Sequence, residues 1–173
     1  MIRNTYLIEL SNLGKILSSI GNKLISSQTI LKCIAYDNKN ALSQSDVSIN
    51  EKVDLIGGGS KPQEQQRIFK VPFNDNIIEG ARTELRFFLP VFKPNNQYLS
   101  DITVTFQLII HNSLWELSGN NIRAFILIEE LLKNFNGYDI DSVGELYLDG
   151  SIRIVTWSKN YSGYELIFKG KTK

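Results

Sequence analysis

DITVTFQLIIH, residues 101–111, is the clearest strand in the sequence. Its apolar side chains recur at every second position, and positions two apart lie on one face of a strand. That face carries Ile102, Val104, Phe106, Leu108 and Ile110. The opposite face is mostly polar, so we expect one face of this strand to form part of a core.

Similar alternation predicts further strands at residues 67–73, 82–92 and 163–169. Pro72 marks the end of the first of these or a sheet edge, because proline has no N–H to donate. The positions that share a face are Phe69, Val71 and Phe73; Leu85, Phe87, Leu89 and Val91; and Tyr164, Leu166 and Phe168.

A tight turn is predicted between two more strands. Residues 145–148 and 151–157 are strand-like, and Asp149 and Gly150 separate them. The Asp-Gly dipeptide tolerates the positive φ angles of a type I′ turn, which is a common connection in hairpins. We therefore expect these two strands to pair with each other.

The N-terminal segment has a helical pattern. Leucine and isoleucine recur at spacings of three and four, which places them on one stripe of a helix that covers a sheet. Glycine inside a helix costs up to about 1 kcal/mol relative to alanine, so we expect a kink or break near Gly21. Ser26 or Ser27 then caps a second short helix. The stripe consists of Leu7, Leu10, Leu13, Leu17, Ile20 and Leu24.

A central helix is predicted at residues 120–135, with Ser118 or Asn120 as the N-cap. Gly137 suits the left-handed residue that often ends a helix. The predicted apolar face consists of Ile122, Phe125, Ile126, Leu132 and Phe135, and it is widened by Ala124, Leu127, Ile128 and Leu131, so we expect this helix to be covered on more than one side.

The order of these elements is helix, strands, helix, strands, which predicts an α+β fold with a largely antiparallel sheet. A chain of 173 residues fits one domain. We divide this single domain, residues 1–173, into an N-terminal helical segment (1–36), a long polar excursion (37–66) and a core of sheet and helix (67–173).

The polar excursion at residues 37–66 is the best candidate for a contact surface. Loops longer than about 12–15 residues in compact domains are often functional or disordered. A merely flexible linker is an equally good interpretation of this composition. If the segment makes an interface, its apolar residues are the candidates: Val47, Ile49, Val53, Leu55 and Ile56.

The composition excludes several classes of protein. Nineteen Lys and Arg residues against eighteen Asp and Glu residues leave a net charge of +1, without the basic footprint of a dedicated nucleic-acid binder. The apolar stretches are far shorter than the roughly 20 residues of a membrane helix, and the start does not resemble a signal peptide. The lone cysteine fits assembly in a reducing cytosol. We expect no membrane partner.

We expect no enzymatic activity and no cofactor. His111 ends a strand without an obvious nucleophile beside it in the sequence, and catalytic histidines need such a partner. Cys33 lies on the apolar face of a short helix, where a free cysteine usually behaves as a small buried hydrophobic residue. Two acidic clusters, at residues 46–54 and 139–145, lack the spacing of a calcium-binding loop. No catalytic, cofactor-binding or metal-binding residues are therefore predicted.

The C-terminal half resembles the head–tail connector, neck and tail-terminator proteins of tailed bacteriophages. A break around Trp115 is part of the same resemblance. Residues 31–36, followed by Ala41 and Leu42, resemble the opening segment of these phage proteins. Within the group the chain looks most like the neck ring proteins of crAss-like phages. The segments that carry the resemblance are residues 108–111, 121–132, 143–148 and 161–166.

This resemblance implies a structural protein of the virion that forms a ring at the neck, joins portal to tail and continues the DNA channel. It implies a homo-oligomer of about twelve copies. The implied partners are the portal, adjacent neck or tail proteins and DNA that passes through without sequence-specific binding. The protein would assemble in the cytoplasm of the bacterial host and remain at the neck or tail of the virion.

Other functions stay open at this point. A tail terminator that caps the tail tube is the alternative within the same group. A non-phage adaptor or immunity-type binding module would instead be a monomer or a simple dimer. A small-ligand enzyme would require side chains from separate strands to converge in a deep polar pocket that contains His111.

Overall fold

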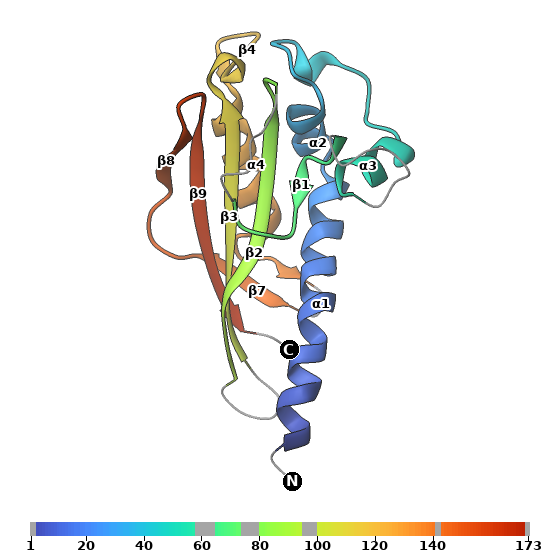
Figure 1. Ribbon diagram of the computed structural model, residues 1–173, viewed down its shortest axis with the longest axis vertical. Helices are drawn as coiled ribbons and strands as arrows, with labels where there is room; N and C mark the ends of the chain where they lie inside the picture. Colours follow the sequence, from blue (N-terminus) through green and yellow to red (C-terminus); the bar gives the residue numbers. More distant parts are fainter. Residues whose placement is uncertain (1–2, 58–64, 74–79, 95–99, 141–142, 172–173) are drawn as a thin grey trace.

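Three long antiparallel strands form the centre of the sheet: β2 (Thr83–Pro94), β3 (Ser100–His111) and β9 (Tyr161–Lys171). β3 lies in the middle, with β2 along one edge and β9 along the other (Figure 1). The strands predicted at these three places are confirmed. The computed structural model describes residues 3–57, 65–73, 80–94, 100–140 and 143–171.

Shorter strands extend the sheet on both sides. β1 (Ile68–Phe69) pairs with β2 in parallel. On the other side, β7 (Gly144–Leu148) pairs with β9 and with β6 (Asp139–Ile140). β8 (Arg153–Ser158) also pairs with β9.

β1 is much shorter than the strand predicted at residues 67–73, so that prediction is wrong beyond Phe69. The chain there leaves the sheet edge and crosses the outer face of the sheet. The backbone N–H of Phe73 donates to Oε1 of Gln107 at 2.9 Å instead of to a neighbouring strand. Pro72 has no N–H, so it could not have continued the ladder.

The predicted hairpin of residues 145–148 and 151–157 is wrong, because β7 and β8 do not pair with each other. β9 has eleven residues, and the two strands share one of its edges. β7 pairs with residues 168–170, and β8 pairs with residues 161–165. Gly150 has a φ of 79°, but Asp149 has no positive φ, so the turn is not the predicted type I′. The N–H of Asp149 donates to the carbonyl of Ile167 at 2.7 Å, so the turn leads the chain onward along β9.

A bulge in β2 reverses the predicted alternation at the end of that strand. The register with β3 shifts between Phe88 and Val91, which leaves Leu89 and Pro90 outside the ladder. A bulge exchanges the faces of the residues that follow it. Val91 is therefore exposed, and Phe92 packs against the core in its place.

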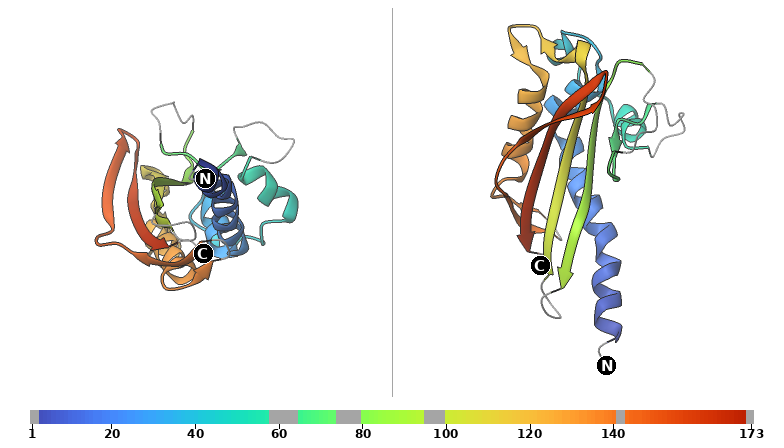
Figure 2. Two further views of the ribbon diagram at one scale, coloured as in Figure 1. Left: turned by 90° about the horizontal axis from the view of Figure 1, so that it is seen from below. Right: turned by 60° about the vertical axis from the view of Figure 1, so that its left-hand side comes forward.

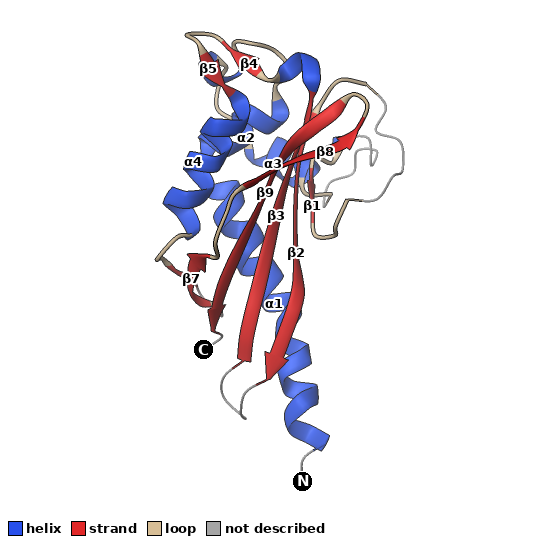
Figure 3. Ribbon diagram, turned by 90° about the vertical axis from the view of Figure 1, so that its left-hand side faces the viewer, coloured by secondary structure: helices blue, strands red, loops and turns tan. Residues whose placement is uncertain are grey.

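Three helices cover one face of the sheet (Figures 2 and 3): α1 (Arg3–Ser26), α2 (Gln28–Ala35) and α4 (Arg123–Phe135). A shorter helix, α3 (Ile49–Leu55), lies to one side of them. Small elements connect these parts: η1 (Ala41–Ser43), η3 (Asn112–Leu114), β4 (Glu116–Leu117) and β5 (Asn121–Ile122).

α1 is continuous, so the predicted break near Gly21 is wrong. Gly21 is buried, and a Cβ at this position would lie 3.6 Å from the Phe87 ring. A Cβ at that distance would make only an ordinary van der Waals contact, so the space does not require a glycine. The buried side chains of Ile20 and Leu24 hold the helix against the core, and this packing compensates for the poor helix propensity of glycine. The cap of α2 is confirmed at Ser27, whose hydroxyl accepts from the N–H of Ile30 at 3.3 Å.

α4 begins without either predicted cap residue. Its N-cap is Ile122, and the N–H of Arg123 donates to the carbonyl of Trp115 at 2.8 Å. A backbone partner thus replaces the side-chain cap. Asn120, with a φ of 60°, belongs to the turn between β4 and β5. Gly137 has a φ of 75° just after the helix, as predicted.

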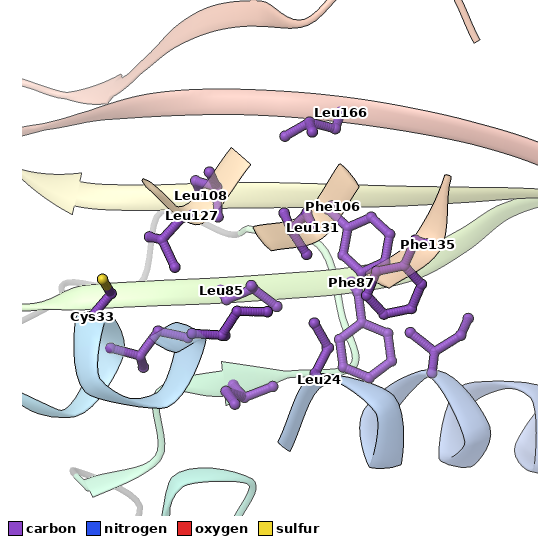
Figure 4. Close-up of a cluster of buried hydrophobic side chains, with 14 of the residues drawn as sticks. Leu24, Cys33, Leu85, Phe87, Phe106, Leu108, Leu127, Leu131, Phe135 and Leu166 are labelled. Carbon is purple, nitrogen blue, oxygen red and sulfur yellow. The ribbon is translucent and has the colours of Figure 1, made fainter. Parts of the chain in front are cut away.

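One hydrophobic core joins the helices to the sheet (Figure 4). Phe106 of β3 lies at its centre, because its ring contacts the rings of Phe87, Phe135 and Phe168 at centroid distances of 6.3, 4.9 and 5.5 Å. These rings come from β2, α4 and β9. The fold is therefore α+β with a largely antiparallel sheet in one domain, as predicted.

The close approach of β3 and β9 gives a test of this arrangement. A Cβ at Gly163 would lie 1.9 Å from the carbonyl oxygen of Leu108, a distance that no backbone tolerates. We expect Gly163→Ala to lower the free energy of unfolding by about 3 kcal/mol or more, since the two strands must separate. Urea unfolding measures this change.

Gly14→Ala is the matched control. Nothing lies within 4 Å of a Cβ at Gly14, and alanine favours a helix by up to about 1 kcal/mol. The control should be neutral or more stable than the wild type. Equal stability of the two variants would contradict the β3–β9 register.

Candidate functional site

The segment predicted as a polar excursion contains a helix that the sequence reading did not predict. α3 begins with a capping box: the N–H of Glu51 donates to the hydroxyl of Ser48 at 3.4 Å, and the N–H of Ser48 donates to the Glu51 carboxylate at 2.8 Å. The expectation of irregular structure at residues 37–66 is therefore wrong in this part. Ser-x-x-Glu was the sequence signal that could have located α3.

The five residues predicted as an interface divide into two groups. Val47 and Leu55 are buried in the core, and Ile56 is partly buried against it. These three residues anchor α3. Ile49 and Val53 are exposed and lie four residues apart on the same side of the helix. We call Ile49 and Val53 the α3 patch.

A cleft of about 310 Å³ opens beside α3. Arg67 reaches it, but its guanidinium donates two hydrogen bonds to the Asp37 carboxylate at 3.2 and 2.8 Å. The charge of Arg67 is therefore already paired and does not mark an anion site. The cleft is lined by Ala35, Tyr36, Glu51, Asp54, Leu55, Gln65 and Arg67.

A second exposed apolar surface crosses β8, β9 and α4, and the sequence reading did not find it. Ile154 lies opposite Tyr164 in the β8–β9 register, so the two side chains share a face. The ring of Tyr164 lies 6.0 Å from the ring of Phe125, between centroids. Ile154 and Phe125 are exposed, and Tyr164 between them is partly buried. We call Ile154, Tyr164 and Phe125 the β8 patch.

Phe125 corrects the predicted orientation of the central helix. We expected its side chain on the core face, but α4 is rotated so that Ala124, Leu127 and Leu131 face the core. Apolar residues cover more than one side of this helix, so their spacing does not fix a single orientation. The exposed side of α4 therefore keeps an aromatic residue.

The outer face of the sheet carries a row of polar residues that is largely buried. Arg86, Gln107, Glu165 and Arg153 lie opposite one another across β2, β3, β9 and β8. Gln107 donates to the Glu165 carboxylate at 3.1 Å, and Arg153 donates to the same carboxylate at 2.7 Å. Sequence alternation predicted a polar face for β3, and the structure shows that this face is covered.

Glu84 completes this network as a fully buried carboxylate. Arg86 donates to it from Nε and Nη2 at 3.0 and 2.8 Å, and Arg82 donates to its other oxygen. The guanidinium of Arg86 lies over the rings of Phe69 and Phe73, at 4.4 and 5.2 Å from their centroids. These contacts hold the segment from Phe69 to Phe73 across the outer face of the sheet. We therefore assign the network a structural role.

Arg123 is a second buried charge, and its partners are backbone carbonyl groups. It donates from Nε to Leu114 at 2.8 Å, from Nη1 to Cys33 and to Tyr36 at 3.1 Å, and from Nη2 to Asn38 at 2.8 Å. Burial lowers the pKa of this guanidinium, but arginine remains charged at neutral pH. Arg123 therefore ties the end of α2 to the start of α4.

His111 has a partner that the sequence did not make obvious. Its Nδ1 lies 2.8 Å from Oγ of Ser113, and it also accepts from the N–H of Ser113 at 3.3 Å. Its ring packs edge-on against Tyr161. These contacts cap the short turn η3, which is a structural use of the histidine.

Cys33 is fully buried, as predicted. Burial in the apolar core raises the pKa of its thiol to about 11. A thiolate is the reactive form of cysteine, so this environment disfavours nucleophilic chemistry.

The charged clusters noted in the sequence do not converge on a metal site in the described ranges. Within those ranges, no group of three or more His, Cys, Asp and Glu side chains could hold a metal ion. Asp46 pairs with Lys32 at 2.8 Å, and Lys169 pairs with Asp149 at 2.7 Å. Asp141 lies outside the described residues. No helix in the described part of the chain is long and apolar enough to cross a membrane.

These features describe a small α+β protein with internally paired charges and two exposed apolar patches. The YomW family model matches residues 27–170, and the chain therefore belongs to the YomW family. This family associates the chain with bacteriophages. The match begins at Ser27, the cap of α2, and ends within β9, so α1 lies before it. A comparison with curated proteins found no match.

The role of Arg123 can be measured by its replacement with methionine. Arg123→Met removes the donors of four largely buried carbonyl groups, so we expect the free energy of unfolding to fall by about 3 kcal/mol or more. Arg153→Met is the control, because Arg153 is largely exposed and such ion pairs contribute about 0–1 kcal/mol. Similar losses in both variants would contradict the role of Arg123.

The burial of Cys33 predicts its reactivity. With a pKa of about 11, about one thousandth of the thiol is ionised at pH 8. A thiol reagent should therefore modify the folded protein at least a hundredfold more slowly than the urea-unfolded chain. Mass spectrometry over time measures both rates. Equal rates would show that the thiol is accessible in the folded state.

Proposed function

We propose that this chain is a non-enzymatic structural protein of a phage particle, which forms a ring at the neck between portal and tail. Two findings support the proposal. The family associates the chain with bacteriophages. The α+β fold is compatible with the resemblance to connector proteins that the C-terminal half carries.

The observation that carries the proposal is the exposure of large apolar side chains on several elements. Ile49 is 79% exposed, Ile154 is 67% exposed and Phe125 is 55% exposed. Contiguous exposed apolar surface, as in the β8 patch, usually marks a place that another protein covers. We infer that this chain works inside an assembly and not as a free monomer.

In the proposed assembly, copies of the chain contact one another in a closed ring of about twelve, a number that the family resemblance alone suggests. The portal and adjacent neck or tail proteins are the other partners. DNA passes through the ring without sequence-specific contacts, which suits a net charge of +1. The ring assembles in the host cytoplasm and stays in the virion.

A gene deletion in the phage tests this proposal. We expect the deletion to yield DNA-filled heads without joined tails, because the ring between portal and tail is missing. Electron microscopy of the lysate measures the fraction of complete particles. Heads joined normally to normal tails would overturn the proposal, and normal heads with tails of abnormal length would favour a tail terminator instead.

Complementation of the deletion tests whether the function is non-enzymatic. A chain with both His111→Ala and Cys33→Ala should restore near-normal numbers of particles, because the proposed function uses neither side chain chemically. Circular dichroism of the purified variant shows that it is folded. A folded double variant that restores no particles would contradict a purely structural function.

A further inference from the structure

Asn136 and Gly137 form the junction between α4 and β7. Asn136 is the C-cap of α4, and its N–H donates to the carbonyl of Leu132 at 3.0 Å. Gly137 follows with a φ of 75°, a conformation that favours glycine. Both residues are exposed, and they are the only Asn-Gly pair in the sequence. The junction therefore holds the one asparagine whose successor has no side chain.

Two hydrogen bonds join this pair to β7, which lies beside the end of α4 (Figure 3). The N–H of Gly137 donates to the carbonyl of Leu146 at 2.7 Å, within a parallel bridge between Asn136 and Leu146. The side-chain Oδ1 of Asn136 accepts from the N–H of Leu148 at 2.9 Å. The side-chain amide of Asn136 and the backbone nitrogen after it are thus both bound to β7.

These two groups can react with each other. The backbone nitrogen that follows an asparagine attacks the side-chain carbonyl carbon, a C–N bond forms, and ammonia leaves. The product is a five-membered succinimide, and one water molecule then opens it to aspartate or isoaspartate. A side chain on the following residue hinders the attack, and glycine has none. Asn136 is therefore the asparagine of this chain with the least hindered route to deamidation.

The closed junction keeps the reacting atoms apart. Ring closure brings the nitrogen of Gly137 beside Cβ of Asn136, but a ψ of 111° at Asn136 turns that nitrogen away. The nitrogen must also lose its proton, which the carbonyl of Leu146 holds in a hydrogen bond. The reaction therefore requires β7 to separate from the end of α4. Local openings of this kind occur without unfolding of the whole protein.

We propose that Asn136 is a deamidation site and that opening of the α4–β7 junction controls its rate. The isoaspartate product adds a methylene group to the main chain at the residue that joins α4 to β7. The modified chain then cannot form both hydrogen bonds to Leu146 and Leu148 in the same geometry, so the opening becomes permanent. This inference concerns the lifetime of the folded chain, and it goes beyond the proposed ring.

Peptide mass spectrometry of the purified protein during incubation in a mildly alkaline buffer tests the site. Conversion of the amide to a carboxylate changes the peptide mass, and an isoaspartate methyltransferase labels the isomerised product. We expect Asn136 to react at least about tenfold faster in the urea-unfolded chain than in the folded protein, because opening limits the folded rate. Asn121 is the internal control, since it is exposed but precedes isoleucine, and it should react slowly in both states.

A substitution in β7 tests the control by the junction. Leu146 is fully buried, so Leu146→Ala should weaken the packing of β7 and raise the rate at Asn136 in the folded protein about tenfold or more. Ile154→Ala is the matched control, because Ile154 is exposed on β8, which does not pair with β7. It should leave the rate unchanged. If Leu146→Ala does not fold, the wild type in urea below its unfolding transition replaces it, and the rate should rise there too.

Each outcome decides one part of the proposal. A slow folded rate that rises with Leu146→Ala but not with Ile154→Ala supports it. A reaction at Asn136 no faster than at Asn121 in the unfolded chain would overturn the site. Equal rates in the folded and unfolded protein, or a folded Leu146→Ala variant with the wild-type rate, would overturn control by the junction. None of these results depends on the ring, so the proposed function stands or fails separately.

Discussion

The buried guanidinium of Arg123 donates to four backbone carbonyl groups from two distant parts of the sequence. Cys33, Tyr36 and Asn38 belong to the end of α2 and the chain after it, and Leu114 belongs to the turn after β3. Carbonyl groups at the end of a helix lack partners within the helix, and the helix dipole favours a cation there. Arg123 therefore joins α2 to the C-terminal core, and the matched family range includes both parts.

The sequence predicted the parts of this fold that depend on local periodicity. Alternation located β2, β3 and β9, because each strand has one face against the same core. Asp149 and Gly150 did not reveal that β7 and β8 each pair with β9 instead of with each other, since that dipeptide sets a turn and not the partner of each strand. The bulge near Pro90 and the continuity of α1 through Gly21 likewise depend on contacts with other elements.

The candidate surfaces were only partly predictable, for a related physical reason. Composition marked residues 37–66 as a candidate contact region, but it could not separate Val47 and Leu55, which anchor α3, from Ile49 and Val53, which are exposed. The β8 patch was not predictable at all, because it joins three elements that are distant in sequence. Arginines and carboxylates that a sequence reader would place in solvent are instead paired across the outer face of the sheet. Charges thus stabilise the fold, while several large apolar side chains remain exposed.

The central claim is that this chain works as one subunit of a ring on the axis of a phage particle. Cryo-electron microscopy of the purified virion, with the structure fitted into the density between portal and tail, tests that claim most directly. The account predicts a closed ring of copies at the neck. Density for this fold at a site away from the axis of the neck and tail would contradict it.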